Sequence, residues 1–247
     1  MQKVRTAANA AKCRNNLHNL GLALHEYHNI VGNFPPSYQA LGNDPSLIKP
    51  GIGWGWFILP FIEQKQLDHA LRNENDGFQT LISYWVSPTN YTQTPLALFR
   101  CPNDNGPSTN PNHGFHATSN YRATEYDAQS DLIGLGFDAG GVLYRNSAVR
   151  VTDIGVGTSN VAMVGECSLD ANHWAAIWPG MVGTVFNNGY IVTNISSVEW
   201  DEFAVGSKLN GAAPQAFGSN HNGVNFLFAD GSVQVFHDGD TVPMSRN

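Results

Sequence analysis

Apolar residues near the start of the chain fall on one helical stripe. From residue 13 onward they recur at intervals of four and three residues, which is the spacing of one face of an α-helix. The residues of this stripe are Cys13, Leu17, Leu20, Leu24, Tyr27 and Val31. Gly32 and Asn33 end the pattern, and Pro35–Pro36 prevents the helix from resuming. The sequence therefore predicts one long helix from residue 1 to about residue 31.

The clearest strand pattern lies near the C-terminus. Two β-prone runs, 224–229 and 232–236, flank the dipeptide Asp230-Gly231. Asp-Gly is a preferred two-residue hairpin turn, because both central residues must accept a positive φ. A turn of this kind pairs Phe228 with Val233. The face that we then expect to be buried contains Val224, Phe226, Phe228, Val233 and Val235.

Between these two ends, short β-prone runs alternate with turns rich in Gly, Pro, Ser and Asn. The apolar run 54–62 precedes a predicted short helix at 63–72. Strands or extended segments are predicted at 81–86, 95–99, 141–144, 149–154, 160–164, 183–186 and 190–193. This alternation is typical of antiparallel sheets with long loops. We therefore expect an α+β fold in which the long N-terminal helix packs on an antiparallel β-sheet.

The predicted organisation is one globular head that follows the helix. Residues 1–33 form the helix and its exit, and residues 34–247 form a single β-rich head of a size that one core can support. Within the head, residues 102–200 are a loop-rich insertion and residues 217–237 are the C-terminal hairpin.

The polarity of the chain comes from amides rather than from charges. Charged residues make up 13% of the chain, about half of the ~25% that is usual, while Asn alone occurs 26 times. The net charge of −7 and the lack of a basic run argue against nucleic-acid binding. The longest apolar run, 54–62, is well below the ~20 residues that span a bilayer. The first 14 residues carry a charge of +4, and the remainder carries −11.

Five segments resemble, in order, the landmarks of one bacterial family. They are Cys13–Leu17 with the helix exit at Gly32–Pro36, Trp56–Gln64, Phe99–Asp104, Thr152–Asn160 with Gly165-Glu166, and Phe217–Val233. On these segments the sequence is similar to type IV pilin-like (pseudopilin-like) proteins with a prepilin-type N-terminus and a C-terminal H-X9-DG domain. The matching signature residues are His221, Asp230 and Gly231. One departure is that eight residues, rather than nine, separate His221 from Asp230.

The resemblance implies a structural protein rather than an enzyme, with no cofactor required. Subunits of this kind have an extracytoplasmic head and assemble with other pilin-like subunits through the N-terminal helix. The family places a hydrophobic anchor before this helix, so we expect the chain to be cut at the membrane boundary, with that anchor removed before Met1. The native protein would then be anchored in the inner membrane and face the periplasm, or lie at the cell surface. The basic first 14 residues fit the point where such an anchor leaves the membrane.

The cysteines allow two interpretations of Cys13. Its position on the apolar stripe is typical of a buried free thiol that serves as a small apolar side chain. The oxidising compartment that the resemblance implies instead favours a disulfide with Cys101, which would leave Cys167 unpaired. Both interpretations stay open on the sequence alone.

The C-terminal polar residues have local structural interpretations. Asp230-Gly231 is expected to form the turn, and His221 is expected to be a hydrogen-bonded residue at a strand end, near Asp238 or Asp240. Asp238 and Asp240 are also the candidate calcium ligands, because heads of the resembled kind sometimes carry calcium in their C-terminal loop. The alternative for both aspartates is a plain Asx turn.

Two further functions have candidate residues. Aromatic side chains stack on sugar rings, so Trp174, Trp178 and Tyr190 suggest a glycan-binding surface, although buried core aromatics are commoner. Ser219, His221 and Asp230 suggest a hydrolase triad, but no Gly-x-Ser-x-Gly, P-loop or His-Glu-x-x-His motif accompanies them. We expect a structural function first, glycan binding second and hydrolysis last.

Overall fold

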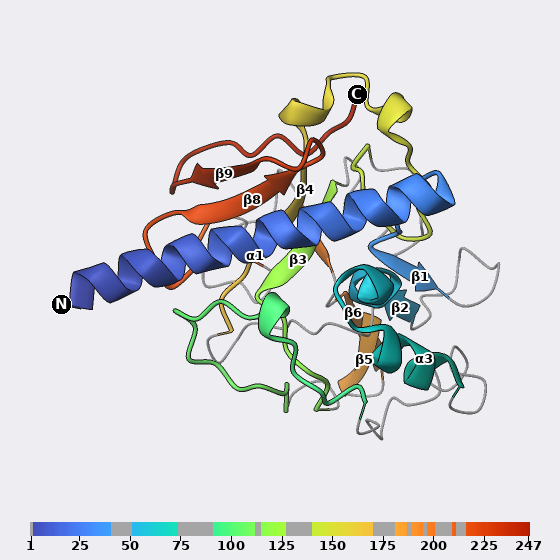
Figure 1. Ribbon diagram of the computed structural model, residues 1–247, viewed down its shortest axis with the longest axis horizontal. Coiled ribbons are helices and arrows are strands. Elements are labelled where there is room, and N and C mark those ends of the chain that lie inside the picture. Colours follow the sequence, from blue (N-terminus) through green and yellow to red (C-terminus); the bar gives the residue numbers. More distant parts are fainter. Residues whose placement is uncertain are drawn as a thin grey trace.

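The computed structural model describes ten stretches of the chain. They are residues 2–40, 51–73, 91–111, 115–126, 140–169, 181–186, 189–194, 197–200, 209–210 and 216–247. One long helix crosses a five-stranded sheet in these stretches (Figure 1). The predicted α+β class is confirmed.

The sheet has the strand order β7-β3-β4-β8-β9. Its strands are β3 (Tyr121–Tyr126), β4 (Ala162–Glu166), β7 (Ser197–Trp200), β8 (Val224–Phe228) and β9 (Val233–Phe236). All neighbours are antiparallel except β3 and β7, which run parallel. The order brings β8, a late strand, to a position next to β4 and places it beneath the N-terminal helix (Figure 1).

The remaining elements are short. Two further antiparallel pairs join β1 (Tyr38–Ala40) with β2 (Gly51–Gly53), and β5 (Met181–Phe186) with β6 (Gly189–Asn194). The other helices are α2 (Trp54–Phe57), η1 (Leu59–Phe61), α3 (Lys65–Asn73), η2 (Ala97–Phe99), η4 (Val151–Asp153) and η5 (Thr158–Asn160). The predicted helix at 63–72 corresponds to α3.

The helix α1 (Gln2–Val31) is buried along one stripe over part of its length. Cys13, Leu17, Leu20 and Leu24 are all 0% exposed, whereas Val31 is exposed. The helix approaches the sheet closely at Gly21, where a Cβ atom would lie 2.7 Å from a methyl carbon of Leu227 in β8.

The two ends of α1 differ in their surroundings. Its C-terminal end is closed by Gly32, which has a φ of +94° and donates its amide to the carbonyl of His28 over 2.7 Å. Residues 3–8 are exposed, and the N-terminal end extends past the sheet (Figure 1). None of the helices in the described part of the chain combines the length and the apolar character needed to cross a membrane.

The strand β8 is buried on both faces. Leu227 faces α1 and belongs to the larger core beneath the helix. The opposite face contributes to a second core, which contains Ala162, Leu209, Phe217, Val224, Phe226, Phe228, Val242 and Met244. Because both faces are covered, all five residues of β8 are buried, and four of them are apolar, with Asn225 as the exception.

The hairpin register that the sequence predicts is wrong by one residue. Leu227, not Phe228, pairs with Val233. The connection contains three residues, because Phe228 donates its amide to the carbonyl of Ser232 over 2.8 Å and Gly231 adopts a φ of +84°. The shift reverses the faces of β9, so Val235 is exposed instead of buried.

The other strand predictions have mixed outcomes. The runs 160–164, 183–186 and 190–193 correspond to β4, β5 and β6. The strands predicted at 141–144 and 149–154 are wrong, since the first is irregular and the second contains η4. The run at 95–99 ends in η2, and the run at 81–86 lies outside the described residues.

The packing at Gly165 in β4 gives a test of the second core. A Cβ atom there would lie 2.5–2.7 Å from ring carbons of Phe226 and Phe217, both of which are fully buried. We expect Gly165→Ala to lower the free energy of unfolding by about 1–3 kcal/mol, measured by urea denaturation. Gly155→Ala is the matched control, because its Cβ would have no neighbour closer than 3.7 Å. Equal stability of the two variants would contradict the packing described.

Candidate functional site

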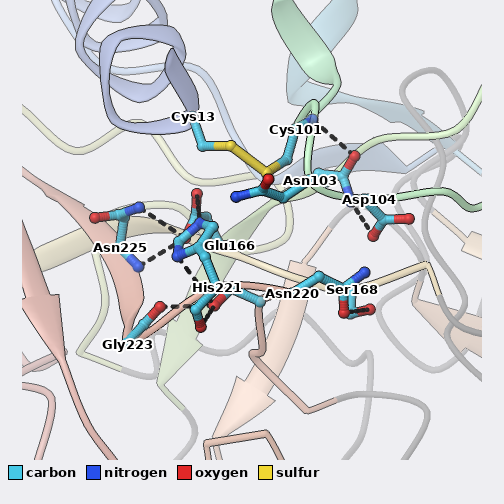
Figure 2. A network of polar contacts seen from close by, with 12 residues as sticks. Cys13, Cys101, Asn103, Asp104, Glu166, Ser168, Asn220, His221, Gly223 and Asn225 are labelled. Carbon is cyan, nitrogen blue, oxygen red and sulfur yellow. Dashed lines mark hydrogen bonds and ion pairs between the residues drawn. A yellow bond between two sulfur atoms is a disulfide. The ribbon is translucent and has the colours of Figure 1, made fainter. Parts of the chain in front are cut away.

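A buried polar cluster lies where four segments of the chain meet beneath α1. It contains Cys13 from α1, Cys101 from the loop after η2, Glu166 from the end of β4, and His221 from the loop before β8. One ligand-type atom from each of the four side chains lies within 4.8 Å of the others. Figure 2 shows the disulfide of this cluster above the His221–Glu166 pair.

Cys13 and Cys101 form a disulfide in the structure. Their Cα atoms are 5.0 Å apart, and 88 positions separate them in the sequence. Of the two interpretations of Cys13, the disulfide is therefore the one that the structure supports, and the free thiol is not. Cys167 is free and buried, and burial raises the pKa of its thiol to about 12, so it is protonated at neutral pH.

The loop that carries Cys101 is held by buried amides and a carboxylate. The Cys101 amide donates to Oδ1 of Asn120 over 2.9 Å, and Nδ2 of Asn120 donates to Oδ2 of Asp104 over 2.7 Å. The same Asp104 oxygen accepts the amide of Leu169 over 2.7 Å. On the helix side, the Tyr121 hydroxyl donates to the carbonyl of Cys13 over 3.1 Å. The disulfide therefore joins two segments that are already positioned by hydrogen bonds.

Glu166 and His221 form a buried ion pair next to the disulfide. Nε2 of His221 lies 3.3 Å from Oε2 and 3.4 Å from Oε1 of Glu166, and both side chains are 2% exposed. The backbone amide and Nδ2 of Asn225 also donate to Oε2, over 2.8 and 2.9 Å. Burial by itself lowers the pKa of His221, but the hydrogen bond and charge of Glu166, together with nearby carbonyls, raise it above its usual value.

The partner of His221 differs from the one that the sequence suggests. His221 contacts Glu166, and not Asp238 or Asp240. The loop before β8 turns back towards β4, which the strand spacing could not reveal. Asp238 accepts a hydrogen bond from Nδ2 of Asn210 over 3.1 Å, and Asp240 accepts one from the amide of His237 over 2.7 Å. Calcium binding by these two aspartates stays a prediction.

The Asp230-Gly231 turn packs against α1. Oδ1 of Asp230 accepts a hydrogen bond from the amide of Ser232 over 2.9 Å, which is an Asx interaction within the predicted turn. Nδ1 of His18 lies 3.3 Å from the carbonyl of Gly231, and a Cβ atom on Gly231 would lie 3.8 Å from the ring of His25. The signature residues thus lie at opposite ends of β8, and the turn end contacts the helix directly.

The geometry around Ser219 bears on the hydrolase alternative. The Oγ atom of Ser219 lies 3.4 Å from Nδ1 of His221. The other ring nitrogen of His221 faces Glu166, so the carboxylate partner of His221 is Glu166 and not Asp230. However, the Ser219 hydroxyl has a shorter bond of 2.6 Å to the carbonyl of Gly223. A hydroxyl that donates to a carbonyl does not donate to His221, so this arrangement does not favour an activated nucleophile.

The glycan-binding candidates fall largely outside the structure. Trp174 and Trp178 are not among the described residues, and only the backbone of Tyr190 is described, within β6.

Several residues of the cluster were not predicted as site residues. Four buried polar side chains form hydrogen bonds in two pairs, which are Asn120 with Asp104 and Asn225 with Glu166. The sequence does contain one signal, because Glu166 is a carboxylate at the end of a β-prone run. A carboxylate is rarely buried without a partner, so this position indicates a buried polar contact.

The comparison with protein families finds one family that covers most of the chain. A family model described as "Protein of unknown function (DUF1559)" matches residues 2–239. The chain belongs to this family. DUF1559 is associated with pilin-like proteins of the H-X9-DG type, and the match includes the cysteines, Glu166 and both ends of β8. Neither a curated protein nor a solved structure matches the chain significantly.

Reduction of the disulfide should destabilise this DUF1559 protein strongly. A cross-link that closes a loop of 88 residues contributes about 4–5 kcal/mol in the chain-entropy account. We expect a phosphine reductant to lower the free energy of unfolding by this amount, measured by urea denaturation. The double variant Cys13→Ala/Cys101→Ala should be insensitive to the reductant, and Cys167→Ser should respond like wild type. A wild-type protein unaffected by complete reduction would contradict the expectation.

The His221–Glu166 pair should make the stability of the oxidised protein depend on pH. The pKa of His221 is raised above 6.5 in the folded state, so the pair contributes fully below about pH 6.5 and loses its contribution as the pH rises through the folded pKa. His221→Gln should therefore lower the free energy of unfolding by about 1–3 kcal/mol on the acidic side. On the alkaline side the same variant should lower it by less. Urea denaturation over a pH series measures this, with His237→Gln, an exposed histidine, as control. A cost that grows with pH would have the wrong sign.

Proposed function

We propose that this chain is the extracytoplasmic head of a pilin-like structural subunit, displayed or assembled at the cell envelope. The proposal rests on the difference in burial between the two ends of α1. From Cys13 to Leu24 its apolar stripe is buried against the head, while the side chains of residues 3–8 are exposed and this end extends past the sheet (Figure 1). A helix of this kind is held by the head at one end and available to other molecules at the other.

The exposed end of α1 has the chemistry of a segment close to a membrane. Lys3 and Arg5 flank Val4, whose side chain is 73% exposed. Basic residues next to an anionic lipid surface are attracted to it, by about 1 kcal/mol each. In the proposed arrangement α1 continues into a hydrophobic anchor, and other pilin-like subunits pack against the exposed part of the helix.

The disulfide supports a location outside the cytoplasm. Disulfides persist in the periplasm and at cell surfaces, whereas thiols in the cytoplasm are kept reduced. The Cys13–Cys101 bond is buried within the head, so the folded protein retains it in an oxidising compartment. We include no catalysis, cofactor or nucleic acid in the proposed function.

Site-specific cross-linking in the native envelope tests the proposal. A photo-cross-linking residue at position 4 should produce a ladder of self-cross-linked subunits in the membrane fraction, detected by immunoblotting. Such contacts are expected because the exposed helix end is the proposed assembly surface.

Position 115 is the matched control for this experiment. Phe115 is 52% exposed but lies in a loop of the head, so the same photo-cross-linking residue there should give few self-cross-links. A ladder of equal intensity from both positions would indicate non-specific proximity. Monomer alone at position 4, or protein found in the cytoplasm, would refute the proposal.

A further inference from the structure

The four side chains around the disulfide form a donor set that suits a metal ion. They offer two sulfurs, one imidazole nitrogen and one carboxylate oxygen, all within 4.8 Å of one another. Cys13, Cys101 and Glu166 are buried, and the His221 side chain is 2% exposed. Four ligands of these types in a closed site are typical of tetrahedral Zn²⁺. In the described part of the chain, this is the one place where three or more such donors gather.

We propose that reduction of the Cys13–Cys101 disulfide converts this cluster into a Zn²⁺ site with Cys13, Cys101, His221 and Glu166 as ligands. In a tetrahedral zinc site the ligand atoms are about 3.3–3.8 Å apart, given bond lengths of about 2.0–2.3 Å. Donor atoms at the limit of the 4.8 Å span therefore need to approach one another by about 1–1.5 Å. The sulfurs must instead separate, because a disulfide holds them about 2.0 Å apart. The disulfide and the metal site therefore exclude each other.

The groups around the donors already orient two of them. Oε2 of Glu166 accepts both hydrogen bonds from Asn225, which leaves Oε1 as the less occupied oxygen. Nε2 of His221 faces Glu166, while Nδ1 lies 3.4 Å from Oγ of Ser219. Outer hydrogen bonds of this kind fix the orientation of metal ligands. The site thus has a supporting shell that does not depend on the disulfide.

A pocket borders the cluster. A pocket lined by Lys3, Thr6, Ala7, Ala10, His221 and Asn222 lies between the N-terminal part of α1 and the loop before β8. Of the four donor residues, His221 also lines this pocket, so the pocket borders the cluster on the side of the imidazole.

The conversion balances in electrons and protons. A dithiol reductant gives two electrons to the Cys13–Cys101 bond and becomes a disulfide, and its two protons pass to the cysteine sulfurs. Zn²⁺ then displaces these protons to solvent, with any proton on Nε2 of His221, and binds the thiolates, the imidazole and the carboxylate. This inference does not depend on the proposed assembly into envelope structures.

Metal analysis of the purified chain tests the site. The protein is reduced with a phosphine, which becomes its oxide with oxygen from water, and is desalted without oxygen. It is then mixed with Zn²⁺ and desalted again, and zinc is measured by mass spectrometry. We expect one zinc per reduced chain and none per oxidised chain. Cobalt in place of zinc should give the intense visible bands of a tetrahedral thiolate site.

Variants separate this site from binding by thiols alone. His221→Ala and Glu166→Gln should each weaken zinc binding by at least tenfold. His237→Ala removes an exposed histidine, and Cys167→Ser removes the third thiol, so both should bind zinc like wild type. Reduced wild type that binds no zinc, oxidised protein that binds it equally, or unchanged affinity in His221→Ala would each overturn the proposal.

A second measurement tests the proposal if the protein unfolds on reduction. Near-ultraviolet circular dichroism reports the packing of the buried aromatic residues. If the reduced protein loses this signal, one equivalent of Zn²⁺ should restore it, because a metal that binds only the folded state shifts the folding equilibrium towards that state. Failure of zinc to restore the signal would also overturn the proposal.

Discussion

The disulfide between Cys13 and Cys101 joins α1 to the head at the point where the helix ceases to be exposed. Before this point residues 3–8 contact solvent, and after it the stripe through Leu17 and Leu24 is fully buried. The apolar stripe packs α1 on the head, and the covalent bond at the start of that stripe fixes where the buried part begins. The loop that carries Cys101 is in turn fixed by Asn120 and by the hydrogen bonds around it. The position of the exposed helix end, on which the proposed assembly depends, therefore follows from this attachment.

The signature hairpin performs a second attachment in the same region. Its strand β8 is covered by α1 on one face and by the second core on the other, so it lies between the two cores. At one end of β8 the Asp230-Gly231 turn contacts His18 of the helix, and at the other end His221 pairs with Glu166 beside the disulfide. The residues that define the family pattern therefore tie helix, sheet and loop together. The same convergence places four metal-type donors in one small volume, which is why one cluster can have a structural role and support a proposed metal site.

The secondary-structure prediction succeeded where apolar residues recur with a clear period. It failed where a buried strand lacks such a period. The stripe of α1 and the strands β4, β5 and β6 followed from pattern alone. The strand β3 was missed because its buried segment contains polar residues, among them Arg122 and Thr124, which give no apolar alternation. The hairpin turn was recognised, but Asp-Gly fits both two-residue and three-residue connections, so the register was off by one. Glu166 was missed as a site residue because its partners lie far away in the sequence.

By itself the sequence determined the length and buried face of the N-terminal helix, its end at Gly32, and the presence of the Asp230-Gly231 turn. These features depend on residues within a few positions of one another, through helical periodicity and the positive φ that glycine accepts. Only the tertiary structure decided which cysteines pair and which carboxylate faces His221. Those contacts join positions 13, 101, 166 and 221, and their distances are set by how α1, β4 and β8 pack. Nothing local in the sequence encodes such distances, because packing of the whole head brings these atoms together.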